Sequence, residues 1–270
     1  MNIDIAHLGL VDEELIAPEI AALELAALDH PGVDLAPYLD LLAEIAEDLA
    51  ETGERALSSP EQALALAEVI GAHYGFDGDR ENYENRENVD LIRVIDRRRG
   101  LPISLAILYV GLARRIGWPA EALNTPGHVL VRIGQDTAPL LIDPFNGGTI
   151  VNADRLATLL SHALGTDVSP SAEHLSPMSN RSMLVRLLIN EATRAEAAGD
   201  PDRALTLFER MTVVAPENSQ AWWERARLEL IGNDPAAARA SLSALLEMTR
   251  DPDMRAHISA MLDSLARPSA

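Results

Sequence analysis

The sequence predicts a mixed α+β protein that is followed by an all-α tail, and three observations support this class. Leu and Ala supply most of the apolar residues and aromatic residues are only 4%, which favours helix over strand. Apolar residues alternate over 129–133, and a turn and a short apolar run follow, as in a hairpin. Beyond residue 180 the chain repeats itself with a period of 34 residues.

Residues 1–100 are predicted to form a helical region that packs on the core. Leu, Ile and Ala recur at three- and four-residue spacing over 11–30 and 34–56, which is the period of an amphipathic helix. Pro18 lies inside the first of these segments, where its ring is expected to break or kink the helix.

A third helix is predicted to follow in the same region. Ser59 is expected to cap it, Gln62 to close the capping box, and the helix to end near His73. Residues 77–88 are polar and resemble a loop. Asn88 is then expected to cap a short helix.

Residues 101–165 are predicted to hold one buried helix against a small antiparallel sheet. Pro102 suits the first turn of that helix, whose apolar residues recur at helical spacing. The alternating residues 129–133 predict a strand, and 139–142 predict its hairpin partner. Asn152 is expected to cap the helix that ends this region.

The tail is predicted to be a helical repeat over 181–270, after a Ser- and Pro-rich linker over 166–180. Small residues where helices cross, with larger ones between them, fit the tetratricopeptide pattern, and a last helix is expected over 253–266. An unrelated antiparallel helix bundle is the alternative. The positions that match at a spacing of 34 are Leu188 with Trp222, Gly199 with Asn233, Ala204 with Ala238, and Phe208 with Leu242.

Charge and composition exclude several classes of function. The net charge is −20, and residues 1–60 hold 14 acidic residues against one basic residue. A surface of this charge repels phosphate backbones, so no nucleic-acid partner is expected. No apolar run is long enough to span a membrane and the first residues do not resemble a secretion signal, so we expect a cytoplasmic protein. Every basic residue is Arg, and the chain has no cysteine.

Three motifs follow one another between residues 96 and 148: DRRRGLPISLAILYVGLARRIGWP, then PGHVLVR, then IDPFNGG. With the upstream HYGFDGDRENYENREN they resemble the SirB-type transglutaminase-like family, over roughly residues 35–265. That family joins a papain/transglutaminase-like core to C-terminal tetratricopeptide repeats. The resemblance therefore implies such a core in the α+β part of this chain, followed by the repeats.

The resemblance also implies a thiol site whose thiol is missing. In the wider superfamily a cysteine opens the buried helix, a histidine follows on the next strand, and an aspartate orients the histidine. His128 and Asp143 match the last two, whereas the cysteine position falls on Pro102. Ser104 is the nearest hydroxyl, but it lies two residues further on, about 200° around a helix. A capping or packing role for Ser104 competes with a role as nucleophile.

Polar residues near the start of the buried helix and beside the two motifs are candidate binding residues. A polar loop, turns and a helix end that carries cations explain the same residues without a ligand. No cofactor and no metal are expected, since the histidines are scattered and no thiolate is present. The candidate binding residues are Asn85, Asn88, Arg99, Asn124 and Asn146.

The missing nucleophile favours a non-catalytic scaffold or regulatory protein that binds another protein or peptide through its repeats. The alternative is an amide-bond hydrolase or acyl transferase, in which His128 is the base, Asp143 orients it, and Ser104 or water attacks. A regulatory subunit whose active site lies on its partner is a third possibility. The sequence does not identify the partner, the substrate or the oligomeric state.

Overall fold

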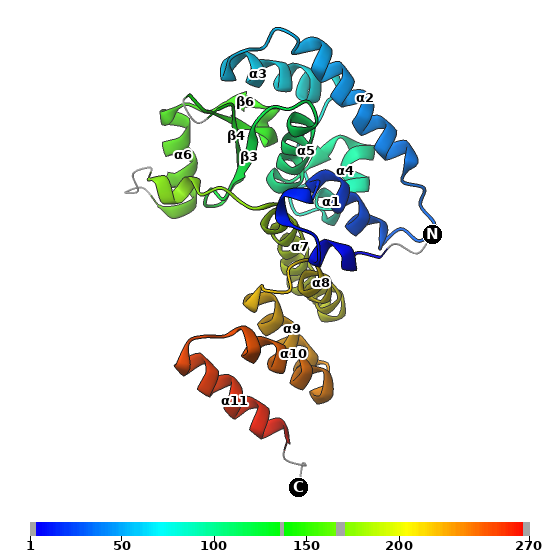
Figure 1. Ribbon diagram of the computed structural model, residues 1–270, viewed down its shortest axis with the longest axis vertical. Coiled ribbons are helices and arrows are strands. Elements are labelled where there is room, and N and C mark those ends of the chain that lie inside the picture. Colours follow the sequence, from blue (N-terminus) through cyan, green and yellow to red (C-terminus); the bar gives the residue numbers. More distant parts are fainter. Residues whose placement is uncertain (1–3, 136–137, 166–170, 267–270) are drawn as a thin grey trace. The chain divides into compact units, whose positions relative to one another are not determined.

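The computed structural model describes residues 4–135, 138–165 and 171–266. Helices predominate and the sheets among these residues are small, which confirms the α+β class (Figure 1). No helix in the described part of the chain is both long and apolar enough to cross a membrane.

The chain divides into two compact units, which we describe one at a time. The first unit is formed mainly by Val11–Leu187. The second combines Ile5–Leu10 with the chain from Leu188 onwards, so the boundary falls within one long helix. The helices of the first unit are α1 (Pro18–Ala27), α2 (Ala36–Thr52), α3 (Ser59–Leu66), α4 (Leu91–Arg97), α5 (Pro102–Arg115) and α6 (Ala153–Leu164).

Two helix starts in the first unit differ from the prediction. Pro18 is the first residue of α1 rather than a kink inside a longer helix, since its fixed φ suits a first turn. Ser58, not Ser59, caps α3, and Glu61, not Gln62, closes the capping box. Ser59 is instead the first helical residue, and its hydroxyl donates to the carbonyl of Ala138 at 2.7 Å.

The helix that begins with α3 continues as a π-helical turn over Ala67–His73, so its predicted end near His73 is confirmed. A Cβ atom on Gly71 would lie 2.6 Å from the carbonyl oxygen of Gly147. Gly71 therefore lets this turn approach the loop that follows Asp143, and the approach helps to position the candidate site.

The polar stretch 77–88 contains structure that the sequence did not reveal. β1 (Asp77–Gly78) pairs in parallel with β2 (Arg99–Gly100), a ladder too short to leave a periodic pattern. Asn88 does not cap α4 as predicted. Asp90 caps it, with its carboxylate accepting from the backbone N–H of Arg93 at 3.1 Å, and Asn88 lies buried in the preceding turn.

The core of the first unit is α5, and every residue of it from Pro102 to Ala113 is buried. It packs against one face of an antiparallel sheet of order β3-β4-β5-β6, and Leu156 and Leu160 of α6 pack against Leu130 on the other (Figure 1). The predicted hairpin is confirmed as β4 and β5, whereas β3 and β6 were missed. The strands are β3 (Ala120–Leu123), β4 (Leu130–Ile133), β5 (Leu140–Asp143) and β6 (Thr149–Ile150).

Asn152 caps α6 as predicted, since its side chain accepts from a backbone N–H of the first turn. The linker predicted over 166–180 lies partly outside the described residues. Its described part pairs with the outer edge of β3: the N–H of Met178 donates to Ala122 at 2.8 Å, and the N–H of Asn124 donates to Ser176 at 2.9 Å.

The second unit shows the predicted repeat directly. α8 and α10 begin and end 34 residues apart, and an Asp caps each of them. Gly199 and Asn233 both have positive φ, at 75° and 59°, so the chain turns in the same way before each of these helices. Residues that match at this spacing, such as Ala204 and Ala238, are buried. The helices are α7 (Asn180–Ala197), α8 (Pro201–Val214), α9 (Ser219–Ile231), α10 (Pro235–Met248) and α11 (Pro252–Ala266).

The second unit is completed at one side by the start of the chain. A short 3-10 turn over Ala6–Gly9 packs against α8, and Ile5 and Leu8 are buried. At the other end α11 packs on α10, with Ile258 fully buried beside Leu242. These contacts give the two repeats the extra layers that a short solenoid needs for its end faces.

Candidate functional site

The predicted contact between His128 and Asp143 is present. Asp143 is the last residue of β5, and His128 lies two residues before β4, its antiparallel neighbour. The register, with Val131 opposite Ile142, brings the end of one strand beside the entry to the other. His128 Nε2 lies 2.8 Å from Asp143 Oδ1, which is a direct hydrogen bond.

Asp143 is completely buried and is saturated with donors. Besides His128, it accepts from the N–H of Phe145 at 3.1 Å, from Asn146 Nδ2 at 2.5 Å and from Arg155 Nη2 at 3.3 Å. Burial raises the pKa of the Asp143 carboxyl, but the donors, His128 first, outweigh burial and hold that pKa below its usual range. Asp143 is therefore a fixed anion. We call this set of residues the Asp143 network.

His128 keeps one ring nitrogen open. Nε2 faces the ionised Asp143 and is therefore assigned as the donor, so that in the neutral form of the ring Nδ1 is an acceptor. Nδ1 makes no hydrogen bond to any residue that the structure describes. The ring meets Phe145 edge to face at 5.9 Å, and the His128 side chain is 11% exposed. The pair thus has the geometry of a base that is oriented by a carboxylate.

Two arginines of this region were missed by sequence reasoning. Arg80 lies over the ring of Phe145 and donates from Nη2 to the carbonyl of Phe145 at 2.8 Å and to Asn146 Oδ1 at 2.7 Å. Arg155 reaches Asp143 from the first turn of α6. Arg80 lies in the polar stretch 77–88, where no motif pointed to a functional role. The only signal for Arg155 in the sequence was its position in the first turn of the helix that Asn152 caps.

Ser104 belongs to a different set of contacts. Its side chain is completely buried, and its hydroxyl donates to the backbone carbonyl of Asn88 at 2.6 Å. That carbonyl also accepts from the N–H of Leu101 at 3.1 Å. Pro102, at the expected thiol position, is the buried first residue of α5 and offers no side-chain nucleophile.

The contacts of Ser104 continue into a second buried carboxylate. Asn88 donates to the carbonyl of Asn82 at 2.8 Å and accepts from Arg97 at 3.0 Å, and Arg97 donates to Asp79 at 2.7 Å. Burial raises the pKa of the Asp79 carboxyl, but the backbone bond from Asn82 and the bond from Arg97 lower it more, so this pKa is below its usual range. We call these residues, with Ser104, the Asp79 network.

The remaining predicted binding residues have structural contacts. Asn85 caps a short turn by accepting from the N–H of Glu87 at 3.0 Å. Arg99 donates to two backbone carbonyls, that of Gly75 at 2.9 Å and that of Arg98 at 2.8 Å. Asn124 is exposed and joins the edge of β3 through its backbone. Of the five predicted binding residues, the structure places Asn146 in the Asp143 network.

The chemistry open to this site follows from these contacts. An imidazole oriented by a carboxylate is in place, but the serine nearest the expected thiol position donates its hydrogen bond to the carbonyl of Asn88. A general base without a side-chain nucleophile can act only on a water molecule or on a group of the ligand itself. Within the described residues, no group of three or more His, Asp or Glu side chains could hold a metal ion.

Two family models match the chain. The model described as the transglutaminase-like superfamily matches residues 36–189, and a tetratricopeptide repeat model matches residues 189–254. The first match contains both buried networks, and the second covers most of the repeat helices.

Several curated proteins are similar to this chain. A UPF0162 protein of Xylella fastidiosa is 31% identical over 258 residues, which cover 93% of this chain and 92% of that protein. Protein SirB1 of Salmonella typhimurium is 24% identical over 252 residues, which cover 92% and 91%. F-box only protein 21 of Homo sapiens is 39% identical over 82 residues, which cover 30% of this chain and 13% of that protein.

Proposed function

The chain belongs to the transglutaminase-like superfamily, and from that premise we propose that it is a non-catalytic protein that binds another protein, as a scaffold or a regulatory subunit. The main support is the contact of Ser104. Its buried hydroxyl donates to the carbonyl of Asn88, so it does not donate to the open nitrogen of His128. Pro102 provides no replacement for the thiol.

The Asp143 network supports a structural role for the pair of His128 and Asp143. A carboxylate that accepts four hydrogen bonds and is completely buried fixes the turn after β5, whatever His128 does. Such a polar cluster favours one arrangement of the strands because each donor has a single acceptor within reach. The pair can therefore persist in a protein that performs no chemistry.

The repeat tail is the surface that we propose for the partner. Tetratricopeptide repeats are stacked helix pairs, and their exposed faces accept an extended or helical segment of another protein. The tail carries 11 Arg against 13 acidic residues, whereas residues 1–60 carry one against 14. The tail thus repels an acidic segment far less than the start of the chain does.

The enzymatic alternative has one observation in its favour. His128 is held by an ionised Asp143 and keeps Nδ1 open, which is the arrangement of a general base. In that case a water molecule on Nδ1 would attack an amide bond, and Ser104 would take no part. Turnover of amide substrates that is lost in His128→Ala would support this alternative and contradict the non-catalytic proposal.

Capture of partners from the native cell tests the proposal. Three baits are compared: the intact chain, the variant with both His128→Ala and Ser104→Ala, and a chain ending at Leu187, where the second unit begins. We expect the first two to retain the same proteins and the third to lose them. Circular dichroism checks that each bait is folded. Partners that bind equally well without the tail would contradict the tail as the binding surface.

A further inference from the structure

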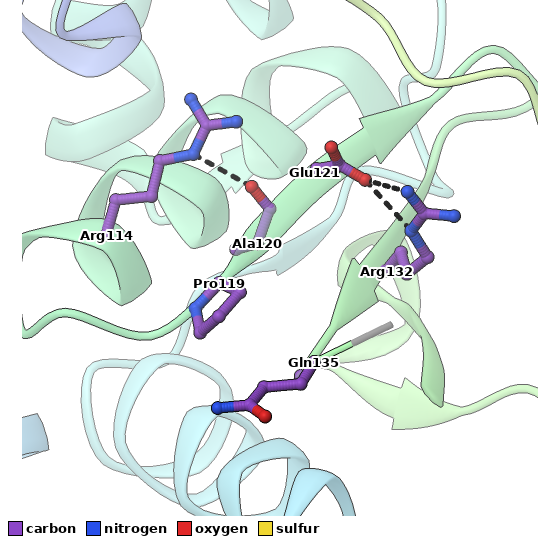
Figure 2. A pocket seen from close by; sticks show the side chains of 7 residues that line it. Arg114, Pro119, Ala120, Glu121, Arg132 and Gln135 are labelled. Carbon is purple, nitrogen blue, oxygen red and sulfur yellow. Dashed lines mark hydrogen bonds and ion pairs between the residues drawn. The ribbon is translucent and has the colours of Figure 1, made fainter. Parts of the chain in front are cut away.

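Two cavities adjoin along the outer edge of β3, and neither contains a residue of the two buried networks. Their volumes are about 600 Å³ and about 460 Å³, and both are lined by Arg114 and Glu121. Figure 2 shows the larger one, with Arg114, Glu121, Arg132 and Gln135 around it. The smaller one extends towards Glu14 and the start of α7. Because they share Arg114 and Glu121, they are neighbours within the first unit, and we refer to the two together as one polar space.

Arg114 stands between the two cavities with part of its hydrogen-bonding capacity unused. Its Nε donates to the carbonyl of Ala120 at 2.8 Å, and its Nη1 donates to Asn180 Oδ1 at 2.7 Å (Figure 2 shows the first bond). A guanidinium has five N–H groups, so three remain. Partial burial lowers the pKa of the guanidinium, and the charges of Glu121, Glu19 and Glu13 offset this lowering only in part.

The three carboxylates whose charges act on Arg114 are each bonded to a different arginine. Their charges raise the pKa of Arg114 only from a distance, and none of them accepts a hydrogen bond from Arg114. An additional anion could therefore accept hydrogen bonds from the remaining N–H groups of Arg114 and pair with its charge. The three pairs are Glu121 with Arg132 at 2.9 Å, Glu19 with Arg115 at 2.8 Å, and Glu13 with Arg181 at 3.0 Å.

The backbone at this edge offers no place for an added strand. The carbonyl of Ala120 already accepts from Arg114, and Pro119 has no N–H to donate. Further along, Ala122 and Asn124 are bonded to the segment over 176–178. A ligand here is thus recognised by its charge and not by β-sheet hydrogen bonds.

We propose that this space binds the C-terminal carboxylate of a peptide, with Arg114 as the residue that receives the carboxylate. Two neighbouring cavities of about 600 Å³ and about 460 Å³ offer room for a chain of several residues, which is more than a single small acid fills. The acidic side chains in the same walls, Glu13, Glu14 and Glu121, disfavour a doubly charged phosphate more than a singly charged carboxylate.

A titration of the intact, ¹⁵N-labelled protein with three probes tests this site. The probes are acetyl-tetraalanine with a free C-terminus, the same peptide as its C-terminal amide, and sodium acetate. We expect the free peptide to shift the backbone amide signals of Glu121 and Gln135, and the amide to leave them in place. Acetate is expected to bind at least about tenfold more weakly than the peptide.

Exposed Gln135 allows a test that does not disturb the fold, because it lines the cavity without a structural contact to the networks. Gln135→Glu should weaken binding of the free peptide about three- to tenfold, and Gln135→Lys should strengthen it, both less so at high salt. Gln220→Glu, the same change on an exposed position of α9, is the matched control and should have no effect.

Three results would overturn the proposal. One is the absence of any shift with the free peptide at about 10 mM, or equal shifts with its amide. Another is acetate binding as tightly as the peptide, which would make this a site for small acids. The last is Gln135→Glu behaving like Gln220→Glu, because a carboxylate on Arg114 must sense a new charge in the wall of its cavity.

Discussion

The Asp143 network and the Asp79 network are alike in construction but differ in what they leave open. Each has a buried Asp with a lowered pKa, an arginine and an asparagine. The Asp143 network ends on His128, whose Nδ1 is unbonded among the described residues. The Asp79 network ends on the hydroxyl of Ser104, which donates to a backbone carbonyl and is completely enclosed.

The difference teaches that this fold can hold its serine and its histidine in two separate buried networks. A triad needs nucleophile, base and orienting acid in one hydrogen-bonded chain. Here His128 and Asp143 form one network, while the hydroxyl of Ser104, the serine nearest the expected position, is held in another. Each network then stabilises its own loop, and neither requires the other.

The largest expected effect is that of Asp143→Ala. The change leaves donors from His128, the Phe145 backbone and Asn146 without their acceptor in a buried place, so we expect a loss of about 3–5 kcal/mol in the free energy of unfolding. Urea unfolding measures it. Asp79→Ala is the matched control at the other network.

Asp79→Ala should cost less, about 1.5–3 kcal/mol, because Arg97 keeps an ion pair with Glu87 at 3.3 Å. Equal losses in the two variants would show that the ion pair of Arg97 with Glu87 does not compensate for the lost carboxylate of Asp79. A larger loss of stability for Asp79→Ala than for Asp143→Ala would show that the Asp79 network contributes more to the stability of the fold.

Acid should weaken both networks. The folded pKa of each Asp lies below the unfolded value of about 3.9, so each carboxylate contributes stability above that pH, and the contribution is lost as pH falls through the folded pKa. The free energy of unfolding of the wild type should therefore fall below about pH 4. Asp143→Asn and Asp79→Asn should each give a flatter profile, and an unchanged profile in either would contradict its assigned pKa shift.

The smallest expected effect is the coupling between Ser104 and His128. Ser104→Ala removes one buried hydrogen bond, while the carbonyl of Asn88 keeps its bond from Leu101, so we expect a cost of about 1 kcal/mol. Tyr83 lies beside both networks, since its carbonyl accepts from Asn88 at 3.4 Å and its ring meets Phe145. Ser104 and His128 themselves have different hydrogen-bond partners, so the double variant with His128→Ala should be additive within about 0.5 kcal/mol. A larger coupling energy would show that the two networks depend on each other for stability.

Much of the fold followed from the sequence because its signals are local. Helix periodicity, the caps of α6 and the 34-residue repeat each depend on neighbouring residues, and each was predicted correctly. β1, β2 and β6 have two residues each, too few to alternate. The α3 cap was placed one residue late, at Ser59, although Ser58 and Glu61 stand at capping-box spacing. The bond from Ser59 to Ala138 is a tertiary contact that no local pattern reveals.

The candidate site was predictable where it lay on strands and not where it lay on loops. His128 and Asp143 flank a hairpin, so their proximity followed from the strand pattern and the resemblance. Arg80 contacts the Asp143 network through Asn146, which lies 66 residues further along the chain. Arg80 lies in an irregular segment, so no strand pattern predicted this contact. The direction of the Ser104 hydroxyl depended on the turn at Asn88, which the sequence assigned wrongly as a helix cap.

The central claim is that no nucleophile is paired with His128, and a serine-directed fluorophosphonate probe tests it most directly. The intact wild-type protein and its His128→Ala variant are incubated with the probe, and the labelled residues are identified by mass spectrometry. We predict no label on Ser104 in either protein, because its hydroxyl is enclosed and bonded to Asn88. A label on Ser104 that appears in the wild type and disappears in His128→Ala would contradict the account.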